Sequence, residues 1–405
     1  MSNIRQKKLM LLGGLRYLLP VIEAAHKQGY YVITADYLPD NIAHKYSDEY
    51  CNVSIIDKEA VLKEAKRLKI DGIMSFAVDP GVTAAAYVAE KMGLPFQCSY
   101  ESACILQNKS KFRSFLADNG FSVPFVKCYA NIKDAVGEAN SFKFPLMVKP
   151  VDSAGSKGVS KVDSEESLQS AIENALIESH IGHFIIEDYL EKVGYSSDSD
   201  CFTIDGDLCY CSFSDQMFDA NADNPFTPAA YVWPSTMPVS VQDELKSELQ
   251  RLMRLLDVGT GVFNVETRLC SDGRPYIMEV SPRGGGNRLS EMLACITSTN
   301  LIDNAVRASV GDPVDVIAQP DYQGYLAEVI LHSRKCGKFK NLIIDKTISD
   351  NHLIEKDLWV KEGDIVESFS GANKAIGTIS LKADSRKSLD MIMNCIGDFI
   401  NVDVD

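Results

Sequence analysis

The chain has 405 residues, of which 45% are hydrophobic and 24% charged, and its formal net charge is −15. Length and composition predict roughly two to three globular domains. The acidic balance argues against a nucleic-acid binder, because a phosphate backbone requires a basic surface, and no apolar run approaches the ~18 residues that cross a bilayer. The eleven cysteines are scattered without Cys-x-x-Cys spacing. Such usage is typical of reduced thiols, so we expect a cytoplasmic protein. From the charge and the lack of a long apolar run we expect neither a nucleic-acid nor a membrane partner.

The segment from residue 8 to about residue 100 alternates short apolar strands with helices. The strands are expected at 9–12, 31–34 and 73–76, and the helices at 18–28, 59–68 and 83–92. This alternation predicts a parallel sheet with right-handed crossovers. Gly13 and Gly14 after the first strand and Asp36 after the second imitate a dinucleotide site, but Gly-x-Gly-x-x-Gly spacing is absent. The two glycines are therefore a tight turn or part of a small-molecule crevice at the edge of the sheet.

The segment that begins near Asn108 has the residues of a phosphate site. Lys109 opens a helical stretch over 110–119, and Lys149 ends an apolar strand over 144–150. A loop of small residues follows at 153–158. Backbone donors on a flexible loop beside a lysine favour phosphate binding, and the alternative is a plain hairpin with a glycine turn and a solvated lysine.

A hairpin at residues 261–283 is the most informative segment. Asp272-Gly273 is a strong signal for a two-residue loop between runs of strand-forming residues. If those two residues are the loop, Ser271 faces Arg274, and this pairing sets the register of the whole hairpin.

In this register Glu266 lies opposite Glu279, and Asn264 lies opposite Ser281 on the same face, because side chains alternate along a strand. Two directly opposed carboxylates repel each other unless a cation lies between them. Mg²⁺ typically takes one or two carboxylates together with substrate phosphates. Arg283 adds a planar donor for phosphate oxygens. The alternative interpretation is an exposed, charged hairpin with a surface ion pair.

The other segments predict ordinary elements. A short buried strand at 184–190 ends in acids, and an amphipathic helix covers 238–256. Beyond Pro313 a third unit begins, with strands at 325–331 and 375–381 and a helix at about 385–399.

Five of these segments together resemble the ATP-grasp superfamily in order and spacing: Lys109, Lys149 with its loop, residues 187–190, the pair Glu266 and Glu279, and Arg283. Over residues 5 to about 310 the chain is similar to the carboxylate-amine ligase branch, which includes L-amino acid ligases and purine-pathway synthetases. The resemblance implies an ATP-grasp fold of mixed α/β and α+β class. It implies a pre-ATP-grasp domain with a parallel sheet at 1–107, a two-lobed ATP-grasp domain at 108–312 with a hinge near 187–191, and a small α+β domain at 313–405.

The same resemblance implies a nucleotide site between the two lobes. Lys109 and Lys149 would contact the ATP phosphates, and the loop at 153–158 would close over them through its backbone. Backbone groups at the hinge would read the adenine edge, and one acidic side chain after the hinge would replace the usual ribose-binding acid. The loop positions are Ser153, Ser156 and Gly158, the hinge positions are Glu187, Asp188 and Leu190, and the acid is Glu191.

For the chemistry, the resemblance implies that Glu266, Glu279 and Ser281 ligate Mg²⁺, with Mn²⁺ as a substitute. Many relatives have Asn where this chain has Ser281. Arg283 would hold the transferred phosphoryl group, so Arg283 and Lys149 are the catalytic candidates.

The function implied is an ATP-dependent ligase that activates a small carboxylate as an acyl phosphate and joins it to an amine, with an amino acid as one substrate. Two alternatives stay open. One is a purine-pathway enzyme that formylates or carboxylates a phosphoribosylated amine, which would need an anion pocket near Arg288. The other is a nucleotide-binding regulator without catalysis. Many relatives are homodimers, so a homodimer is a further expectation.

Overall fold

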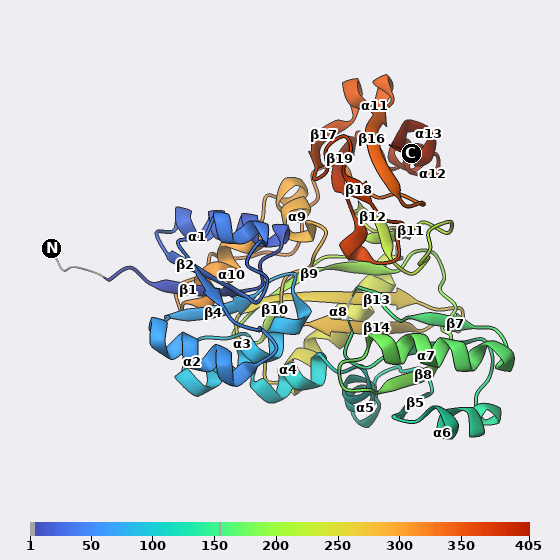
Figure 1. Ribbon diagram of the computed structural model, residues 1–405, viewed down its shortest axis with the longest axis horizontal. Helices are drawn as coiled ribbons and strands as arrows, with labels where there is room; N and C mark the ends of the chain where they lie inside the picture. Colours follow the sequence, from blue (N-terminus) through green and yellow to red (C-terminus); the bar gives the residue numbers. More distant parts are fainter. Residues whose placement is uncertain (1–4, 154) are drawn as a thin grey trace.

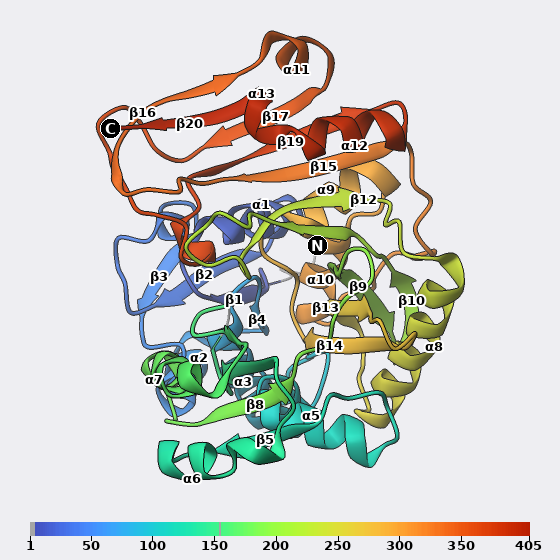
Figure 2. The same ribbon diagram turned by 90° about the vertical axis from the view of Figure 1, so that its right-hand side faces the viewer.

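The computed structural model describes residues 5–153 and 155–405, so Ala154 of the predicted phosphate loop lies outside the described residues. Figure 1 shows the chain as an N-terminal sheet with its helices, two lobes that follow it, and a C-terminal sheet. In the view of Figure 2 the C-terminal sheet caps the molecule, and the first lobe lies at the opposite end. Among the described helices, none combines the length and apolarity that spanning a membrane requires.

The N-terminal sheet is parallel, as predicted, with strand order β3-β2-β1-β4. Its elements are β1 (Lys8–Leu12), α1 (Leu19–Lys27), β2 (Tyr31–Asp36), β3 (Glu49–Asn52), α2 (Lys58–Leu68), β4 (Gly72–Ser75) and α3 (Asp79–Met92). Alternate residues of β1 enter different cores: Leu9 and Leu11 pack with α1, whereas Met10 and Leu12 pack with α2 and α3. Strand β3 was not predicted. Helix α3 begins four residues before the predicted start, which places Asp79 in its first turn.

The first lobe is an antiparallel sheet of order β5-β8-β6-β7, covered by α7. Its elements are β5 (Val126–Tyr129), α6 (Ile132–Gly137), β6 (Leu146–Pro150), β7 (Ser160–Val162), α7 (Leu168–Glu178) and β8 (Phe184–Asp188). Two helices, α4 (Tyr100–Leu106) and α5 (Lys109–Asp118), connect it to the N-terminal sheet.

The second lobe is an antiparallel sheet of order β10-β9-β13-β14. Its elements are β9 (Ser197–Ile204), β10 (Asp207–Cys211), α8 (Val239–Leu255), β13 (Gly261–Leu269) and β14 (Pro275–Ser281). Helix α8 covers one face with Leu245, Leu249 and Leu252, as its amphipathic pattern predicts. The opposite face carries the polar side chains of the candidate site over one part and the apolar side chains of Phe202 and Val262 over another.

The hairpin loop differs from the prediction. Cys270, not Ser271, lies opposite Arg274, because Cys270 N–H donates to Arg274 O at 3.0 Å and the loop has three residues. A bulge at Met278 then adds one residue to β14. The two irregularities cancel, so Glu266 lies opposite Glu279 and Asn264 opposite Ser281, as predicted.

The C-terminal part contains a five-stranded sheet of order β11-β12-β15-β19-β17 and a three-stranded sheet of order β18-β16-β20. The strands are β11 (Asp215–Phe218), β12 (Pro228–Trp233), β15 (Tyr325–Leu331), β16 (Gly337–Ile344), β17 (Leu353–Leu358), β18 (Ile365–Val366), β19 (Gly377–Ala383) and β20 (Ile400–Val404). Because β12 pairs with β15, this sheet includes strands from both sides of the predicted boundary at 312/313. The predicted helix at 385–399 is broken at Cys395 into α12 (Arg386–Asn394) and α13 (Ile396–Phe399).

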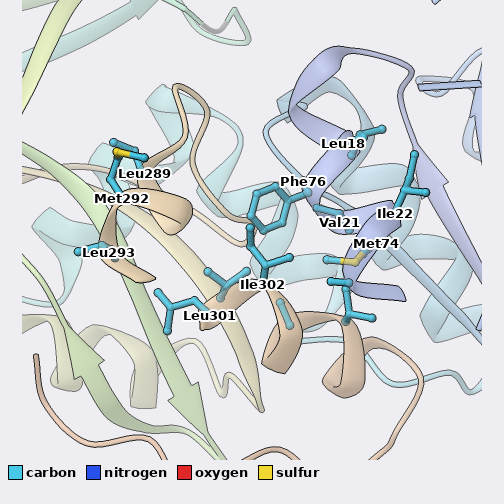
Figure 3. Close-up of a cluster of buried hydrophobic side chains, with 14 of the residues drawn as sticks. Leu18, Val21, Ile22, Met74, Phe76, Leu289, Met292, Leu293, Leu301 and Ile302 are labelled. Carbon is cyan, nitrogen blue, oxygen red and sulfur yellow. The ribbon is translucent and has the colours of Figure 1, made fainter. Parts of the chain in front are cut away.

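An apolar cluster joins the N-terminal sheet to α9 (Leu289–Thr297) and α10 (Leu301–Ser309). Figure 3 shows its side chains meeting across the interface: Leu18, Val21, Ile22, Met74 and Phe76 from one side and Leu289, Met292, Leu293, Leu301 and Ile302 from the other. Burial of these apolar side chains holds α9, and with it the preceding loop at 282–288, against the N-terminal sheet.

Candidate functional site

The polar face of the second lobe carries two rows of side chains. Strand β9 pairs with β13, so Asp198 lies opposite Glu266, and Asp200 lies opposite Asn264. Each row therefore crosses three strands, from β9 through β13 to β14. Burial and the charge of Glu266 raise the pKa of Asp198 to about 7. Sequence reasoning missed both aspartates, although their spacing of two within a strand was a usable signal.

One cation lies beside each of the opposed glutamates. Lys109 Nζ lies 3.4 Å from Glu279 Oε2, and an Arg268 nitrogen lies 2.9 Å from Glu266 Oε1. The side chains of Glu266 and Glu279 are 30% and 36% exposed, so a ligand can reach them. Among residues 5–153 and 155–405, no three His, Cys, Asp or Glu side chains could hold a metal by themselves. Two hard carboxylates fit Mg²⁺ when phosphate and water complete its shell.

Arg283 is held by Asp79 of the N-terminal unit. Its Nε donates to Asp79 Oδ1 at 2.8 Å, and a terminal nitrogen donates to Oδ2 at 2.6 Å. Ser281 Oγ also donates to Asp79, at 2.9 Å, and accepts from Gln107 Nε2 at 2.7 Å. Burial would raise the pKa of Asp79, but the Arg283 charge and these hydrogen bonds hold it below its usual value. Asp79 was not predicted, because 204 residues separate it from Arg283.

Lys149 forms an ion pair with Glu187, the first predicted hinge residue. Arg113 Nε donates to the other Glu187 oxygen at 3.0 Å. The Glu187 side chain is 2% exposed, and although burial alone would raise its pKa, the charges of Arg113 and Lys149 lower it to about 2. Arg113 also donates to Met278 O at 2.8 Å, which ties α5 to the hairpin. Lys149, Glu187 and Arg113 thus form a buried group of charges, which Arg113 connects to the hairpin.

The described part of the predicted phosphate loop contacts two other regions. Ser156 Oγ donates to Phe226 O at 2.9 Å, and Asn224 Nδ2 donates to Ser156 O at 2.9 Å. The same Asn224 amide donates to Ser370 O at 3.3 Å. Lys109 Nζ donates to Ser153 O at 3.0 Å, so the first residue of the loop is also tied to a predicted phosphate ligand. Gly158 has a φ of +67°, which allows the sharp turn into β7.

The hinge backbone is tied to both lobes. Asp188 N–H donates to Phe125 O at 2.9 Å, and Ser271 N–H donates to Glu191 O at 2.8 Å. The second contact joins the segment after the hinge to the hairpin loop. Burial raises the pKa of Asp188. Leu190 is half-buried against the hairpin side chains of Cys270, Tyr276 and Met278, and Glu191 is exposed.

Arg288, near which the purine-pathway alternative would need an anion pocket, lies among carboxylates. Its nitrogens lie 2.6 Å from Glu355, 3.4 Å from Glu291 and 3.6 Å from Glu328. Such a setting repels a phosphate group.

Residues 142–291 match the family model described as ATP-grasp domain. The formate-dependent phosphoribosylglycinamide formyltransferase of Synechococcus sp. (strain WH7803) is 27% identical over 323 residues, or 78% of this chain and 79% of that protein. The L-amino acid ligase of Bacillus licheniformis has a similar solved structure, with a TM-score of 0.80 and 19% identity over 99% of both chains.

A third similar structure is the biotin carboxylase domain of the 2-oxoglutarate carboxylase of Hydrogenobacter thermophilus, in complex with MgADP and bicarbonate. Its TM-score is 0.73, with 14% identity over 98% of this chain and 91% of that chain. These comparisons confirm the predicted ATP-grasp fold.

Proposed function

Since residues 142–291 match the ATP-grasp domain model, we propose that the chain activates a small carboxylate as an acyl phosphate and joins it to an amine, giving ADP and phosphate. The observation that carries this proposal is the pair Glu266 and Glu279, opposed in register beside Lys109. A protein that only binds nucleotide has no need for two repelling carboxylates at this position. A regulator without catalysis is therefore the weaker candidate.

The reaction needs activation because a carboxylate is a poor electrophile. One carboxylate oxygen attacks the γ-phosphorus of ATP, and the bond between this phosphorus and the β–γ bridging oxygen breaks to release ADP. The amine then attacks the acyl carbon, the acyl–oxygen bond breaks to release phosphate, and the nitrogen loses a proton. No protein nucleophile takes part, so the protein acts by positioning and electrostatic stabilisation.

Glu266 and Glu279 would hold Mg²⁺, and the third predicted ligand, Ser281, adds a hydroxyl oxygen in the neighbouring row. When bound, the ion supplies positive charge at the phosphate oxygens. Lys109 and Lys149 add charge on the side of the first lobe. Arg283 uses three N–H groups for Asp79 and Gly284 O, which leaves others for the transferred phosphoryl group.

Two parts of the protein would close over the nucleotide. The loop at 153–158 would supply backbone donors at Ser153, Ser156 and Gly158, and the contacts of Ser156 to Asn224 and Phe226 would help to hold it over the nucleotide. The hinge from Glu187 to Leu190 would read adenine through its backbone, with Glu191 at the ribose. Closure keeps water from the acyl phosphate, which water would otherwise hydrolyse.

A second candidate function is transfer of a formyl or carboxyl group to a phosphoribosylated amine, which the similarity to the Synechococcus formyltransferase favours. This candidate needs a site for the substrate phosphate. The only predicted position for it, Arg288, lies among three carboxylates, which favours the first candidate.

An isotope experiment tests the acyl phosphate directly. The carboxylate substrate is labelled with ¹⁸O in both oxygens, and the released phosphate is analysed by mass spectrometry. We expect one ¹⁸O atom in each phosphate, because the attacking oxygen leaves with the phosphoryl group. Unlabelled phosphate together with amide product would contradict the mechanism.

A further inference from the structure

Arg288, Glu291, Glu328 and Glu355 form a group that we call the Arg288 cluster. Its members come from different parts of the chain: Arg288 and Glu291 from the start of α9, Glu328 from β15, and Glu355 from β17. The cluster therefore lies where the ATP-grasp and C-terminal parts meet, and Tyr17 of the N-terminal unit approaches it.

The charges of the Arg288 cluster do not balance. One guanidinium faces three carboxylates, and the Glu328 side chain is 0% exposed. Glu355 is 50% exposed, so the cluster also reaches solvent. Burial raises the pKa of Glu291 and of Glu328 to about 7 despite the nearby arginine. A further positive charge would stabilise the ionised form of these carboxylates.

A separate observation comes from hydrogen bonding. Gln216, Tyr231, Glu328 and Ser380 are successive neighbours across the five-stranded sheet, on one face. Among the described residues, Oε1 of Glu328 and Oε1 of Gln216 are buried side-chain atoms without a hydrogen-bond partner. Both are acceptors, and buried acceptors are rarely left unpaired. Tyr231 separates Gln216 from Glu328 in this row, so one small ligand would satisfy Glu328 Oε1 alone, which otherwise faces an Arg288 nitrogen at 3.6 Å.

Aromatic side chains border the same place. Tyr17 and Trp359 pack edge to face with ring centroids 5.9 Å apart, and Tyr17 OH donates to Asn287 Oδ1 at 3.0 Å. Glu291 and Glu328 lie close enough to Tyr17 to raise its pKa, after the larger effect of burial. Aromatic faces attract cations, and the Arg16 guanidinium already lies over the Trp359 ring, 5.8 Å from its centroid.

A chain of hydrogen bonds connects the cluster to the proposed reaction centre. Asn287, the neighbour of Arg288, donates to Tyr231 OH at 3.3 Å, and Tyr231 OH donates to Asp198 Oδ2 at 3.0 Å. Asp198 lies opposite Glu266 in the register of β9 and β13. A small substrate that reaches from the hairpin to the cluster would therefore lie along the loop at 282–288.

We propose that the Arg288 cluster binds the ammonium group of a substrate, with Glu328 as its main acceptor. This inference rests on the proposed ligase function and names the substrate class as an amino acid or another ammonium-bearing compound. An ammonium group supplies three donors and one positive charge, which match the Glu328 oxygen without a hydrogen-bond partner and the excess of carboxylates. A substrate with a phosphate at this place is disfavoured by the same charges.

The test is calorimetric titration of the full-length protein in the presence of ADP and Mg²⁺. The probes are L-amino acids, their des-amino counterparts such as propionate for alanine, and their amides, which keep the ammonium but lack the carboxylate. We expect at least one amino acid to bind about tenfold or more tightly than its des-amino counterpart. Binding of the amide at similar strength assigns the cluster to the amine substrate, and loss of binding assigns it to the carboxylate substrate.

The variant Glu328→Gln should abolish the preference for the ammonium group. Glu355→Gln, at a half-exposed position, should weaken this preference, and it serves as the test if Glu328→Gln folds poorly. The control is Glu248→Gln, whose carboxylate pairs with Arg251 on α8. A purely structural ion cluster would leave the preference intact in both cluster variants and overturn the proposal. So would equal binding of the des-amino acids, or no binding of any amino acid. Ammonium-selective binding without ADP formation would instead overturn the ligase function alone.

Discussion

Glu279 is the side chain on which the proposed chemistry depends most. Its variant Glu279→Gln keeps the size of the side chain and removes the charge that faces Lys109 and the proposed metal. We expect ADP formation to fall by about 100-fold or more, because the electrostatic stabilisation of phosphoryl transfer is lost. The side chain is 36% exposed, so the melting temperature should change little. Activity close to that of the Glu248→Gln control would refute the metal assignment.

Glu187 should make the free energy of unfolding depend on pH below about 4.5. Its pKa is lowered from 4.5 to about 2, so its contribution is fully present above pH 4.5 and is lost as the pH falls toward 2. At neutral pH, Glu187→Gln should cost about 3 kcal/mol, because Arg113 and Lys149 stay buried without their partner. Urea unfolding at several pH values measures this cost. A difference between variant and wild type that does not shrink below pH 4.5 would contradict the assignment.

At the scale of elements, the loop between β14 and α9 places Arg283 and Arg288. A Cβ at Gly284 would lie 2.2 Å from two atoms of the buried Phe76 ring, whereas a Cβ at Gly286 would meet its first neighbour at 3.9 Å. We expect Gly284→Ala to lower the free energy of unfolding by about 1–3 kcal/mol and to lower activity, because the loop must leave the N-terminal sheet. Gly286→Ala is the matched control. Equal effects in the two variants, by denaturation and ADP release, would refute this role of the loop.

The same elements show how far sequence reasoning reaches. The parallel N-terminal sheet follows from strand and helix alternation, and the amphipathic helix α8 follows from its apolar spacing. The pairing of Glu266 with Glu279 was predicted, but the register between the loop and the bulge was off by one residue, because the three-residue loop and the bulge depend on local packing. Strand β3 was missed because its four residues lack a clear pattern.

Side chains that meet across the fold could not be predicted in this way. Asp79 contacts Arg283 only after the N-terminal unit docks on the loop. Arg113 reaches Glu187 from a helix, and its charge carried no sign of that contact in the sequence. The carboxylates around Arg288 come from three separate segments, so the sequence indicated an anion pocket where the structure has an acidic cluster. Such contacts depend on tertiary packing, which local patterns do not report.

At the scale of the whole molecule, Asn224 joins three parts: its own loop between β11 and β12, the loop at 153–158, and the C-terminal segment at Ser370. In Asn224→Ala the proposed closure of the loop at 153–158 should be less stable, so water should reach the acyl phosphate. We expect the ratio of amide formed to phosphate released to fall severalfold. Asn221→Ala, at an exposed position of the same loop, is the control. An unchanged ratio in Asn224→Ala would show that this contact does not couple closure to synthesis.

Three parts of the chain supply the proposed reaction centre together. The N-terminal unit holds Arg283 through Asp79, the two lobes supply Lys149 and the opposed glutamates, and the C-terminal sheet supplies Glu328. No part carries all of these groups, so we expect activity only when the parts are assembled as in the structure.

The most direct measurement of the central claim is product analysis of the purified protein with ATP, Mg²⁺ and pairs of amino acids and amines. Nucleotides are separated by chromatography, and condensed products are identified by mass spectrometry. We expect ADP and phosphate in amounts that match an amide, formed only when both substrates are present. AMP and pyrophosphate as the products would contradict the acyl phosphate mechanism.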